Sequence, residues 1–181
     1  RLISSAASDV YKRQKHIHLA SDNKENVFMV AFRTIPEDST GVAHILEHTV
    51  LCGSKKFPVR DPFFSMLKRS MNTFMNAFTS SDWTAYPFAS QNQKDFDNLL
   101  SVYLDSVFFP NLNELDFAQE GHRLEFSELH NRKSELVNKG IVFNEMKGAM
   151  SSVNSILWQT ITKNLFSNTT YHFNSGGEPE E

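Results

Sequence analysis

The sequence predicts an α/β (α+β) fold in which helices pack on a mixed sheet. Apolar, β-branched and aromatic runs typical of strands alternate with stretches whose apolar residues recur every three or four positions, as in helices. The chain has 181 residues, 40% of them hydrophobic, which is enough for the core of one domain. It contains no internal repeat or low-complexity tract, so a layered domain is expected.

The first expected element is a strand over residues 26–36, NVFMVAFRTIP, an apolar run that ends at a proline and predicts burial. A helix over 42–51 follows, because its apolar residues recur at helical spacing. Ser39 or Thr40 is placed to cap this helix, and Gly53 is placed to end it as a C′ glycine.

The remaining elements are predicted from the same two periods and from turn residues. In order, they are a short helix near 65–69, two strands within 73–90 around a turn at 80–82, an amphipathic helix over 92–109, a helix passing into a strand over 113–129, a polar surface loop over 128–140, and a long helix over 141–166. The two longest helices each carry a broad apolar stripe, as expected of helices in a layered fold.

Neither end of the chain resembles a natural end of a protein. Residues 4–14, SSAASDVYKRQ, match eleven successive residues of one reading frame of a commonly used transposon sequencing adapter. We therefore expect residues 1–14 to be an artefact and exclude them from the fold argument. The sequence also stops in a turn-rich stretch, NSGGEPEE, so residues 15–181 are expected to be part of a longer protein.

The composition argues against several functional classes. The formal net charge is −3 at pH 7 and no basic run resembles a phosphate-binding stripe, so no nucleic-acid partner is expected. No apolar run approaches the roughly 20 residues that span a bilayer, so no membrane partner is expected. The single cysteine excludes an internal disulfide framework and fits an intracellular setting.

Residues 41–54, GVAHILEHTVLCGS, carry the most informative motif. On a helix, His44 and His48 lie one turn apart on the same face, where both rings can bind one zinc ion. Glu47 borders the same site, and the order H-x-x-E-H is the inverzincin pattern, in which the glutamate acts as general base toward water. Helices with two surface or core histidines show the same pattern, so by itself it leaves both interpretations open.

A catalytic zinc ion needs a third protein ligand and one open position. The acidic candidates downstream are Asp82, Glu120, Glu125, Glu128, Glu135 and Glu145. Glu145 is favoured because it is expected in the first turn of the helix over 141–166, where it would be half-buried and stabilised by the helix dipole. Cys52, one turn beyond His48, could close a structural zinc site, but a buried free thiol is preferred.

Three segments, in this order, resemble the pitrilysin-type (insulinase, M16) zinc metallopeptidases: GVAHILEHTVLCGS, NTFMNAFTSSDWTAYPF and GIVFNEMKGAM. The resemblance extends from about residue 20 to residue 177, and the block over 91–126 is specific to one branch of this family. It implies one zinc ion bound by three protein ligands beside a catalytic base. The implied ligands are His44, His48 and Glu145, and the implied base is Glu47.

The resemblance also implies how a substrate would bind. In the wider family, the strand matching Asn76, Ala77 and Phe78 lies beside the zinc ion, and an extended peptide pairs with it. Main-chain pairing of this kind tolerates varied sequences, which suits an enzyme that degrades many peptides.

For the whole protein, the resemblance implies a zinc metalloendopeptidase that degrades short, unstructured peptides such as cleaved targeting presequences. Residues 15–181 would be part of its pitrilysin-like N-terminal catalytic domain, truncated and inactive alone. Its partners would be unfolded peptide substrates and the missing C-terminal half of the same chain, which together enclose a chamber. The implied location is the mitochondrial matrix or the bacterial cytoplasm.

Two other functions are compatible with the same fold. A non-catalytic scaffold subunit is one, but such a subunit has no reason to keep both histidines and both glutamates of the implied site. A subunit of a heterodimeric processing peptidase is the other, and the branch-specific block over 91–126 argues against it.

Overall fold

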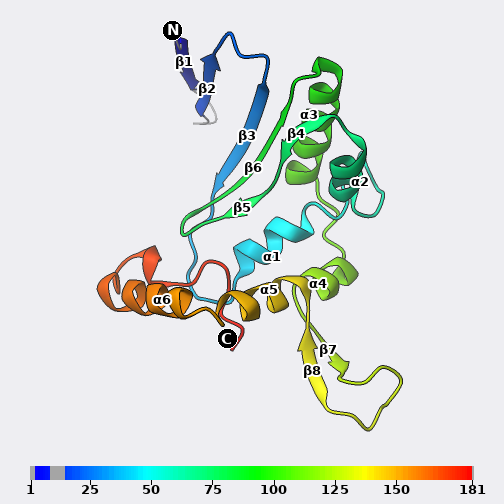
Figure 1. Cartoon of the computed structure of the whole chain (residues 1–181), viewed down its shortest axis with the longest axis vertical. Helices are drawn as coiled ribbons and strands as arrows, with labels where there is room; N and C mark the ends of the chain where they lie inside the picture. Colours follow the sequence, from blue (N-terminus) through cyan, green and yellow to red (C-terminus); the bar gives the residue numbers. More distant parts are fainter. Residues whose placement is uncertain (1–2, 9–14, 181) are drawn as a thin grey trace.

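A computed structural model describes residues 3–8 and 15–180 of the chain (Figure 1). The described elements are, in chain order, β1 (Ile3–Ser8), β2 (Lys15–Ala20), β3 (Asn26–Arg33), α1 (Val42–Thr49), α2 (Pro62–Arg69), β4 (Asn72–Met75), β5 (Phe78–Thr79), β6 (Trp83–Ser90), α3 (Gln93–Phe108), α4 (Glu114–Glu120), β7 (Arg123–Phe126), β8 (Leu136–Lys139), α5 (Ile141–Ala149), α6 (Val153–Leu165) and the 3-10 helix η1 (Thr170–His172). This mixture of helices and strands confirms the predicted α/β fold class.

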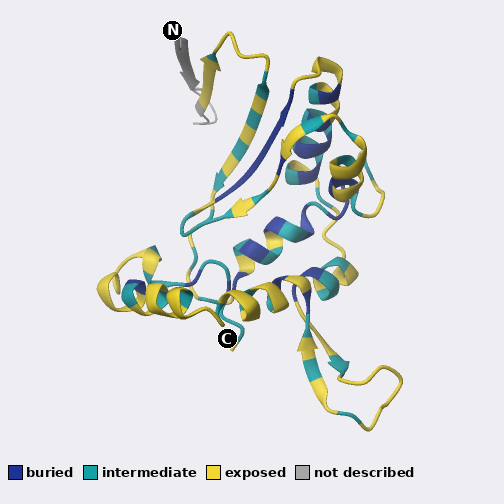
Figure 2. Ribbon diagram, viewed as in Figure 1, coloured by how far each residue is buried: buried dark blue, intermediate teal, exposed yellow. Residues whose placement is uncertain are grey.

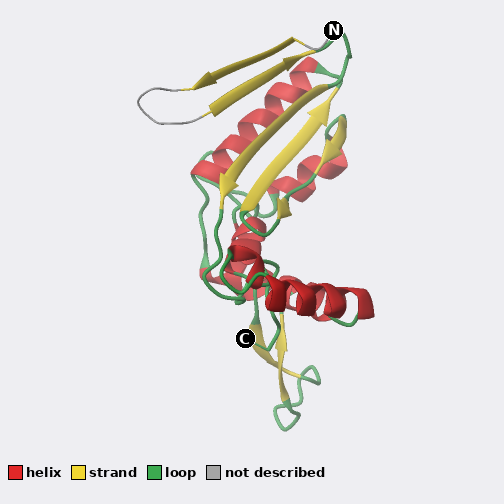
Figure 3. Cartoon of the chain, turned by 90° about the vertical axis from the view of Figure 1, so that its left-hand side faces the viewer, coloured by secondary structure: helices red, strands yellow, loops and turns green. Residues whose placement is uncertain are grey.

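The main sheet has the strand order β3–β6–β4, with β5 also paired to β6, and all of these pairs are antiparallel (Figure 3). The central strand is β6, in which every residue after Trp83 is buried. The prediction of a buried strand over 26–36 is wrong in this respect. Burial alternates along β3, because it is an edge strand and only one of its faces meets the core.

The core lies between this sheet and α3 (Figure 2). Leu99 and Tyr103 of α3 pack on Phe88 of β6, and none of the three is more than 1% exposed. The ring centroids of Phe88 and Tyr103 are 4.8 Å apart, so the helix is fixed on the sheet by aromatic packing. This rigid unit carries β5, which contacts α1.

Strands β4 and β5 form one edge strand that Pro87 of β6 interrupts. From Phe74 onward the two halves keep the same register against β6, and β4 has a register shift between Asn72 and Phe74. Between them, the Asn76 N–H donates to the carbonyl of Pro87 at 3.2 Å, but proline has no N–H to give in return. The Asn76 carbonyl instead accepts a hydrogen bond from the Tyr103 hydroxyl at 3.3 Å.

Both predicted ends of α1 are wrong in detail. The N-cap is Gly41, with a left-handed φ of 76°, and neither Ser39 nor Thr40 caps the helix through its side chain. Glycine is required there because an added Cβ would lie 2.7 Å from the Cα of Gly177. At the other end, i→i+3 hydrogen bonds tighten the chain after Thr49, so the helix has ended before Gly53 is reached.

The predicted helix over 141–166 is two helices, α5 and α6. Residues 150–152 separate them, and the Ser151 hydroxyl donates to the Gly148 carbonyl at 2.6 Å. Ser152 is then the N-cap of α6. Serine side chains offer the backbone an alternative to helical hydrogen bonds, which explains why one apolar period spans two helices.

The predicted surface loop over 128–140 contains a strand, β8, which pairs antiparallel with β7. The resulting hairpin projects away from the helices around it (Figure 1). It leaves the body of the protein at Gly121 and returns at Gly140, where an added Cβ would overlap the Gly121 carbonyl. The residues that flank the hairpin are therefore neighbours in space.

Strands β1 and β2 pair only with each other in the described part of the chain. The assignment of residues 1–14 to a sequencing adapter stays a prediction, and residues 1–2 and 9–14 of that segment lie outside the described ranges. None of the helices within 3–8 and 15–180 combines the length and apolarity that a bilayer crossing requires.

Candidate metal centre

Two helices bring together the three residues that the resemblance implies as zinc ligands. His44 and His48 lie one turn apart on α1, and their ring centroids are 5.1 Å apart. The Glu145 Oε2 atom of α5 lies 3.9 Å from Nε2 of His44 and 3.8 Å from Nε2 of His48. Among the described residues, this is the one group of three or more potential ligands whose atoms all lie within 4.8 Å.

The donor set fits a zinc ion. Two imidazole nitrogens and one carboxylate oxygen are typical of catalytic zinc sites, which keep a fourth position open. Ligand atoms around tetrahedral zinc are about 3.4 Å apart, so the Glu145 oxygen is within roughly half an ångström of the separation that each histidine nitrogen requires. The Glu145 side chain is 56% exposed, so the carboxylate side of the group faces solvent.

Glu145 differs from expectation in its placement on the helix. It lies in the second turn of α5, which has no acidic residue in its first turn, and it is exposed rather than half-buried. The helix begins at Ile141, as predicted, so Glu145 is its fifth residue and lies beyond the first turn, and Val142 is the buried residue of this helix. Stabilisation by the helix dipole is therefore weaker than predicted.

Each histidine ring is held through Nδ1. That atom of His44 donates to the Gly176 carbonyl at 2.8 Å, and that of His48 donates to Glu120 at 3.0 Å. With the proton on Nδ1, the Nε2 lone pair of each ring is free for a cation. The hydrogen bonds thus fix both the tautomer and the ring orientation that metal binding needs.

Glu120 is one of the acidic residues considered as third ligand, and the structure places it behind His48 instead. It is 4% exposed and also accepts a hydrogen bond from Gln119, which is bonded in turn to Arg60. The sequence contains one sign of this role. The helix dipole disfavours an acidic residue in the last turn of a helix, so an acidic residue at that position indicates a stabilising partner elsewhere in the fold.

The hydrogen bond between His48 and Glu120 shifts the pKa of both groups. Burial acts to lower the pKa of His48, but the hydrogen bond with Glu120 and the neighbouring carboxylates outweigh it and raise this pKa. Burial acts to raise the pKa of Glu120, but its hydrogen bonds with His48 and Gln119 and the nearby positive charges lower it. The Glu120 carboxylate is therefore ionised at neutral pH beside the ring that it orients.

Glu47 lies beside the ligand group, as the motif predicts. Its residue is 6% exposed, and its Oε2 accepts a hydrogen bond of 2.5 Å from the Thr79 hydroxyl of β5. The edge strand thus orients the carboxylate that the sequence assigns as general base. Sequence reasoning missed Thr79, since a hydroxyl on a neighbouring strand carries no local pattern.

The structure does not bring the other acidic candidates to this centre. Glu125 lies on β7, where it is paired with Arg123 at 2.7 Å and with Lys139 at 3.4 Å. Glu128 and Glu135 flank the hairpin loop, and Asp82 lies in the turn before β6. None of these belongs to the ligand group found among the described residues.

A cavity of about 260 Å³ adjoins the centre. Its lining residues are Glu47, His48, Leu51, Cys52, Asp61, Phe63, Phe64, Leu67, Met75, Asn76, Ala77 and Glu120. The implied substrate residues Asn76 and Ala77 therefore lie at the same cavity as Glu47. Phe78 does not line it, and its ring stacks on Phe74 with centroids 6.4 Å apart.

Cys52 is a buried free thiol, as predicted. It lies outside the ligand group, and its thiol donates weakly to the His48 carbonyl at 3.6 Å. Burial and nearby carboxylates raise its pKa to about 12, so the thiol is protonated at neutral pH.

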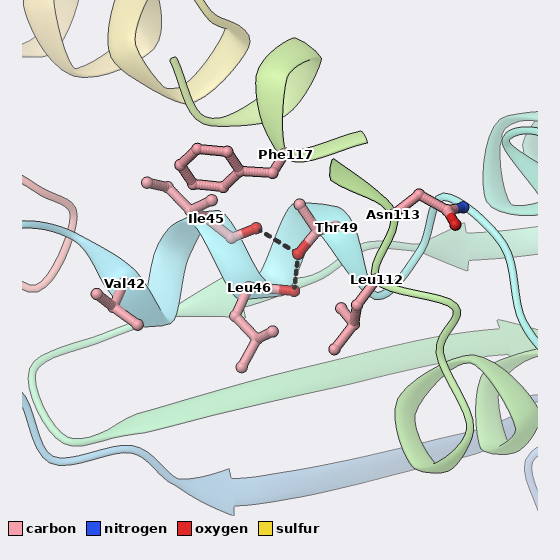
Figure 4. Close-up of a pocket in the computed structure, with 7 residues that line it drawn as sticks. All are labelled: Val42, Ile45, Leu46, Thr49, Leu112, Asn113 and Phe117. Atoms are coloured by element: carbon pink, nitrogen blue, oxygen red, sulfur yellow. Dashed lines mark hydrogen bonds between the residues drawn. The ribbon is translucent and has the colours of Figure 1, made fainter. Parts of the chain in front are cut away.

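A second cavity, of about 250 Å³, lies on the opposite face of α1 (Figure 4). Its lining is almost wholly apolar and consists of Val42, Ile45, Leu46, Thr49, Leu112, Asn113 and Phe117. The Thr49 hydroxyl adds no unpaired polar group to this cavity, because the hydroxyl donates to main-chain carbonyls of its own helix. It contains no residue of the metal centre.

Comparisons with known proteins identify a family to which the chain is similar. Residues 33–157 match the family model described as Insulinase (Peptidase family M16). The chain is 61% identical over 165 residues to the mitochondrial presequence protease of Xenopus tropicalis, covering 91% of this chain and 16% of that protein. It is 58% identical to the mouse protein of that name over 165 residues, with the same two coverages.

More distant relatives agree with this assignment. The mitochondrial presequence protease of Schizosaccharomyces pombe is 51% identical over 176 residues, covering 93% of this chain and 18% of that protein. The chain therefore spans about a sixth of the length of the curated relatives it matches. The crystal structure of a protease from Helicobacter pylori superposes with a TM-score of 0.72 at 18% identity, covering 99% of this chain and 40% of that one, which shows a shared fold.

Proposed function

Because the chain belongs to the insulinase family of peptidases, family M16, we propose that it forms the zinc-binding part of a metalloendopeptidase. The observation that carries the proposal is the convergence of His44, His48 and Glu145 from two helices, with the Glu47 carboxylate beside them. The relatives are named presequence proteases, which supports targeting presequences as substrates, and we extend the proposal to other short, unstructured peptides. The same names support the mitochondrial matrix as its location.

The mechanism assigns separate tasks to these residues. His44, His48 and Glu145 would hold one zinc ion, which when bound supplies a Lewis acid and lowers the pKa of water toward neutrality. The Glu47 carboxylate accepts a proton from the water whose oxygen forms a bond with the scissile carbonyl carbon. It then donates that proton to the amide nitrogen as the C–N bond breaks, so the same carboxylate serves both steps.

The edge strand at Asn76–Phe78 is the proposed binding site for the substrate backbone. Pro87 interrupts the strand there, and the Ala77 N–H is bonded to the Asn76 side chain at 3.0 Å instead of to another strand. An extended peptide that displaces this side chain would gain main-chain hydrogen bonds, which tolerate varied sequences. The adjoining cavity, lined by Phe63, Phe64 and other apolar residues, would take one apolar side chain of the peptide.

The rest of a longer protein is the proposed partner of this chain. The chain spans about a sixth of its relatives, so groups that close a chamber around the substrate would come from the remaining part. Residues 15–181 would then form part of the N-terminal catalytic domain and would be inactive alone.

The test uses the full-length protein that contains this chain, with its Glu47→Gln variant as control. We expect the wild type to bind about one zinc ion and to cleave an unstructured peptide. Glu47→Gln should retain the metal and lose at least the roughly 10²–10⁴-fold contribution of a general base. If both proteins hold zinc and are equally inert, the site is structural and the chain is part of a scaffold subunit.

A further inference from the structure

The turn at residues 174–178 lies against the start of α1, far away in the sequence. Its Gly176 carbonyl accepts the Nδ1–H of His44 at 2.8 Å, across 132 positions of the chain. A main-chain carbonyl can orient a ring only if the turn that presents it is itself fixed. The residue that fixes it is Asn174, whose side chain is buried and only 6% exposed as a residue.

Asn174 closes the turn with both ends of its amide. Its Oδ1 accepts the Gly176 N–H at 3.2 Å, and its Nδ2 donates to the Gly177 carbonyl at 3.3 Å. The Gly177 N–H returns to the Asn174 carbonyl at 3.0 Å. These three bonds hold the Gly176 peptide from both sides, so its carbonyl has one direction.

The turn is anchored to the segment that leads into α1. The Asn174 N–H donates to the Ser39 hydroxyl at 3.1 Å, and the Glu178 N–H donates to the Ser39 carbonyl at 2.7 Å. Gly41 and Gly177 then approach so closely that an added Cβ on either would touch the other residue. This explains why Ser39, predicted as a helix cap, serves the turn instead.

The same turn also touches the helix that carries the third ligand. A Cβ added at Gly176 would lie 2.7 Å from Cε of Met146, the neighbour of Glu145 on α5. The Asn174 Nδ2 atom lies 3.8 Å from Sδ of Met150 at the end of that helix. The turn is therefore packed between the two helices whose side chains form the ligand group.

We propose that Asn174 is a positioning residue for the metal centre: it shapes the turn whose Gly176 carbonyl orients His44 between α1 and α5. The inference rests on the proposed function, because it assumes that His44 binds zinc. Without the Asn174 amide, the Gly176 peptide loses the bonds at its N–H and at the Gly177 carbonyl, and its carbonyl holds the His44 ring less firmly. Loss of such an outer hydrogen bond typically costs 10–100-fold in metal affinity.

The test compares Asn174→Ala and Asn174→Asp with Asn164→Ala in the full-length protein. Asn164 is a matched control, since it is exposed on α6 and bonds only to the Thr160 carbonyl of its own helix. Zinc dissociation constants are measured by competition with a chelator. We expect roughly 10–100-fold weaker binding for Asn174→Ala, a smaller loss for Asn174→Asp, which keeps the acceptor for Gly176, and none for the control.

Peptidase activity supplies the second readout. Excess zinc should restore the turnover of Asn174→Ala with an unchanged KM, since the substrate site is intact. Unchanged zinc affinity in Asn174→Ala would overturn the inference, as would activity that excess zinc does not restore. A wild-type protein that binds no zinc would instead overturn the proposed function, so the two failures are distinguishable.

Discussion

The two histidines of the candidate metal centre are held by acceptors of different charge. His44 donates to a neutral carbonyl, that of Gly176, whereas His48 donates to the ionised carboxylate of Glu120. A carboxylate acceptor makes the imidazole a stronger donor to a metal, so His48 should contribute more to affinity than His44. The two acceptors that cause this difference, Gly176 and Glu120, lie far from the H-x-x-E-H motif in the sequence.

Substitution of Glu120 tests this assignment. In Glu120→Ala the Nδ1–H of His48 loses its acceptor, and the zinc dissociation constant should rise roughly 10–100-fold. Glu120→Gln keeps an amide oxygen in place and should show a smaller loss. Chelator competition measures both, with Glu125→Ala as control, because Glu125 is paired with Arg123 and Lys139 on the hairpin. Equal affinities in all variants would mean that Glu120 has no part in metal binding.

At this scale, the sequence predicts the residues that lie in a local pattern. The motif identifies His44, Glu47 and His48, whereas Glu145 came from the family resemblance and not from spacing. Glu120 was named only as a possible ligand, and its partner across the fold could not be read from one segment. Gly176 acts through its main chain, which no side-chain pattern marks.

At the scale of elements, periodicity located almost every helix and strand but not their ends. The helix over 92–109 is confirmed as α3, and the turn at 80–82 separates β5 from β6. One miss has a distant cause, the glycine cap of α1 forced by the turn at 174–178. Another has a local cause, the two serines that divide α5 from α6, and β8 was missed within a polar segment. Burial of β3 was also overestimated, because a sequence cannot show which strand lies at the edge of a sheet.

The interruption at Pro87 predicts a measurable role for Tyr103. Tyr103→Phe removes the hydroxyl that donates to the Asn76 carbonyl, and the free energy of unfolding should fall by about 0.5–1.5 kcal/mol. Urea unfolding of the chain measures the change. The exposed Tyr171→Phe is the control and should be neutral. A neutral Tyr103→Phe would show that the carbonyl has another partner in solution.

The same tyrosine gives the fold a dependence on alkaline pH. Burial raises the pKa of Tyr103 above its usual value. The unfolded chain, with a tyrosine pKa of about 10, therefore loses this proton first. The contribution to stability is complete below about pH 10 and is lost as the pH rises further toward the folded pKa. Tyr103→Phe should show a smaller decline over that range.

At the scale of the whole molecule, large apolar side chains remain exposed on several elements, among them β3 and α6. Val27 and Met29 of β3 are 66% and 60% exposed, and Val153 and Trp158 of α6 are 78% and 64% exposed. Apolar surfaces of this kind mark interaction sites or aggregation risks in soluble proteins. We expect the remaining part of a longer protein to cover them.

A dye-binding experiment that compares the isolated chain with the full-length protein tests this expectation. The 20.7 kDa chain alone should bind the fluorophore ANS with a blue-shifted emission and should self-associate on size exclusion. The full-length protein should do neither. Trp158→Ser in the isolated chain should reduce ANS binding, because it removes the largest exposed apolar side chain of α6. A monomeric chain without ANS binding would show that these faces need no cover.

The β7–β8 hairpin leaves the body of the protein just after Glu120 and returns just before α5, which carries Glu145. The number of residues between the H-x-x-E-H motif and Glu145, the proposed third ligand, is therefore not a constraint of coordination chemistry. The hairpin can become longer or shorter without moving Glu120 or Glu145. A sequence search that requires a fixed number of residues between the motif and Glu145 will therefore overlook proteins whose hairpin has a different length. For the same reason, the loop over 127–135 can accept an inserted affinity tag or fluorophore that reports on the centre without disturbing it.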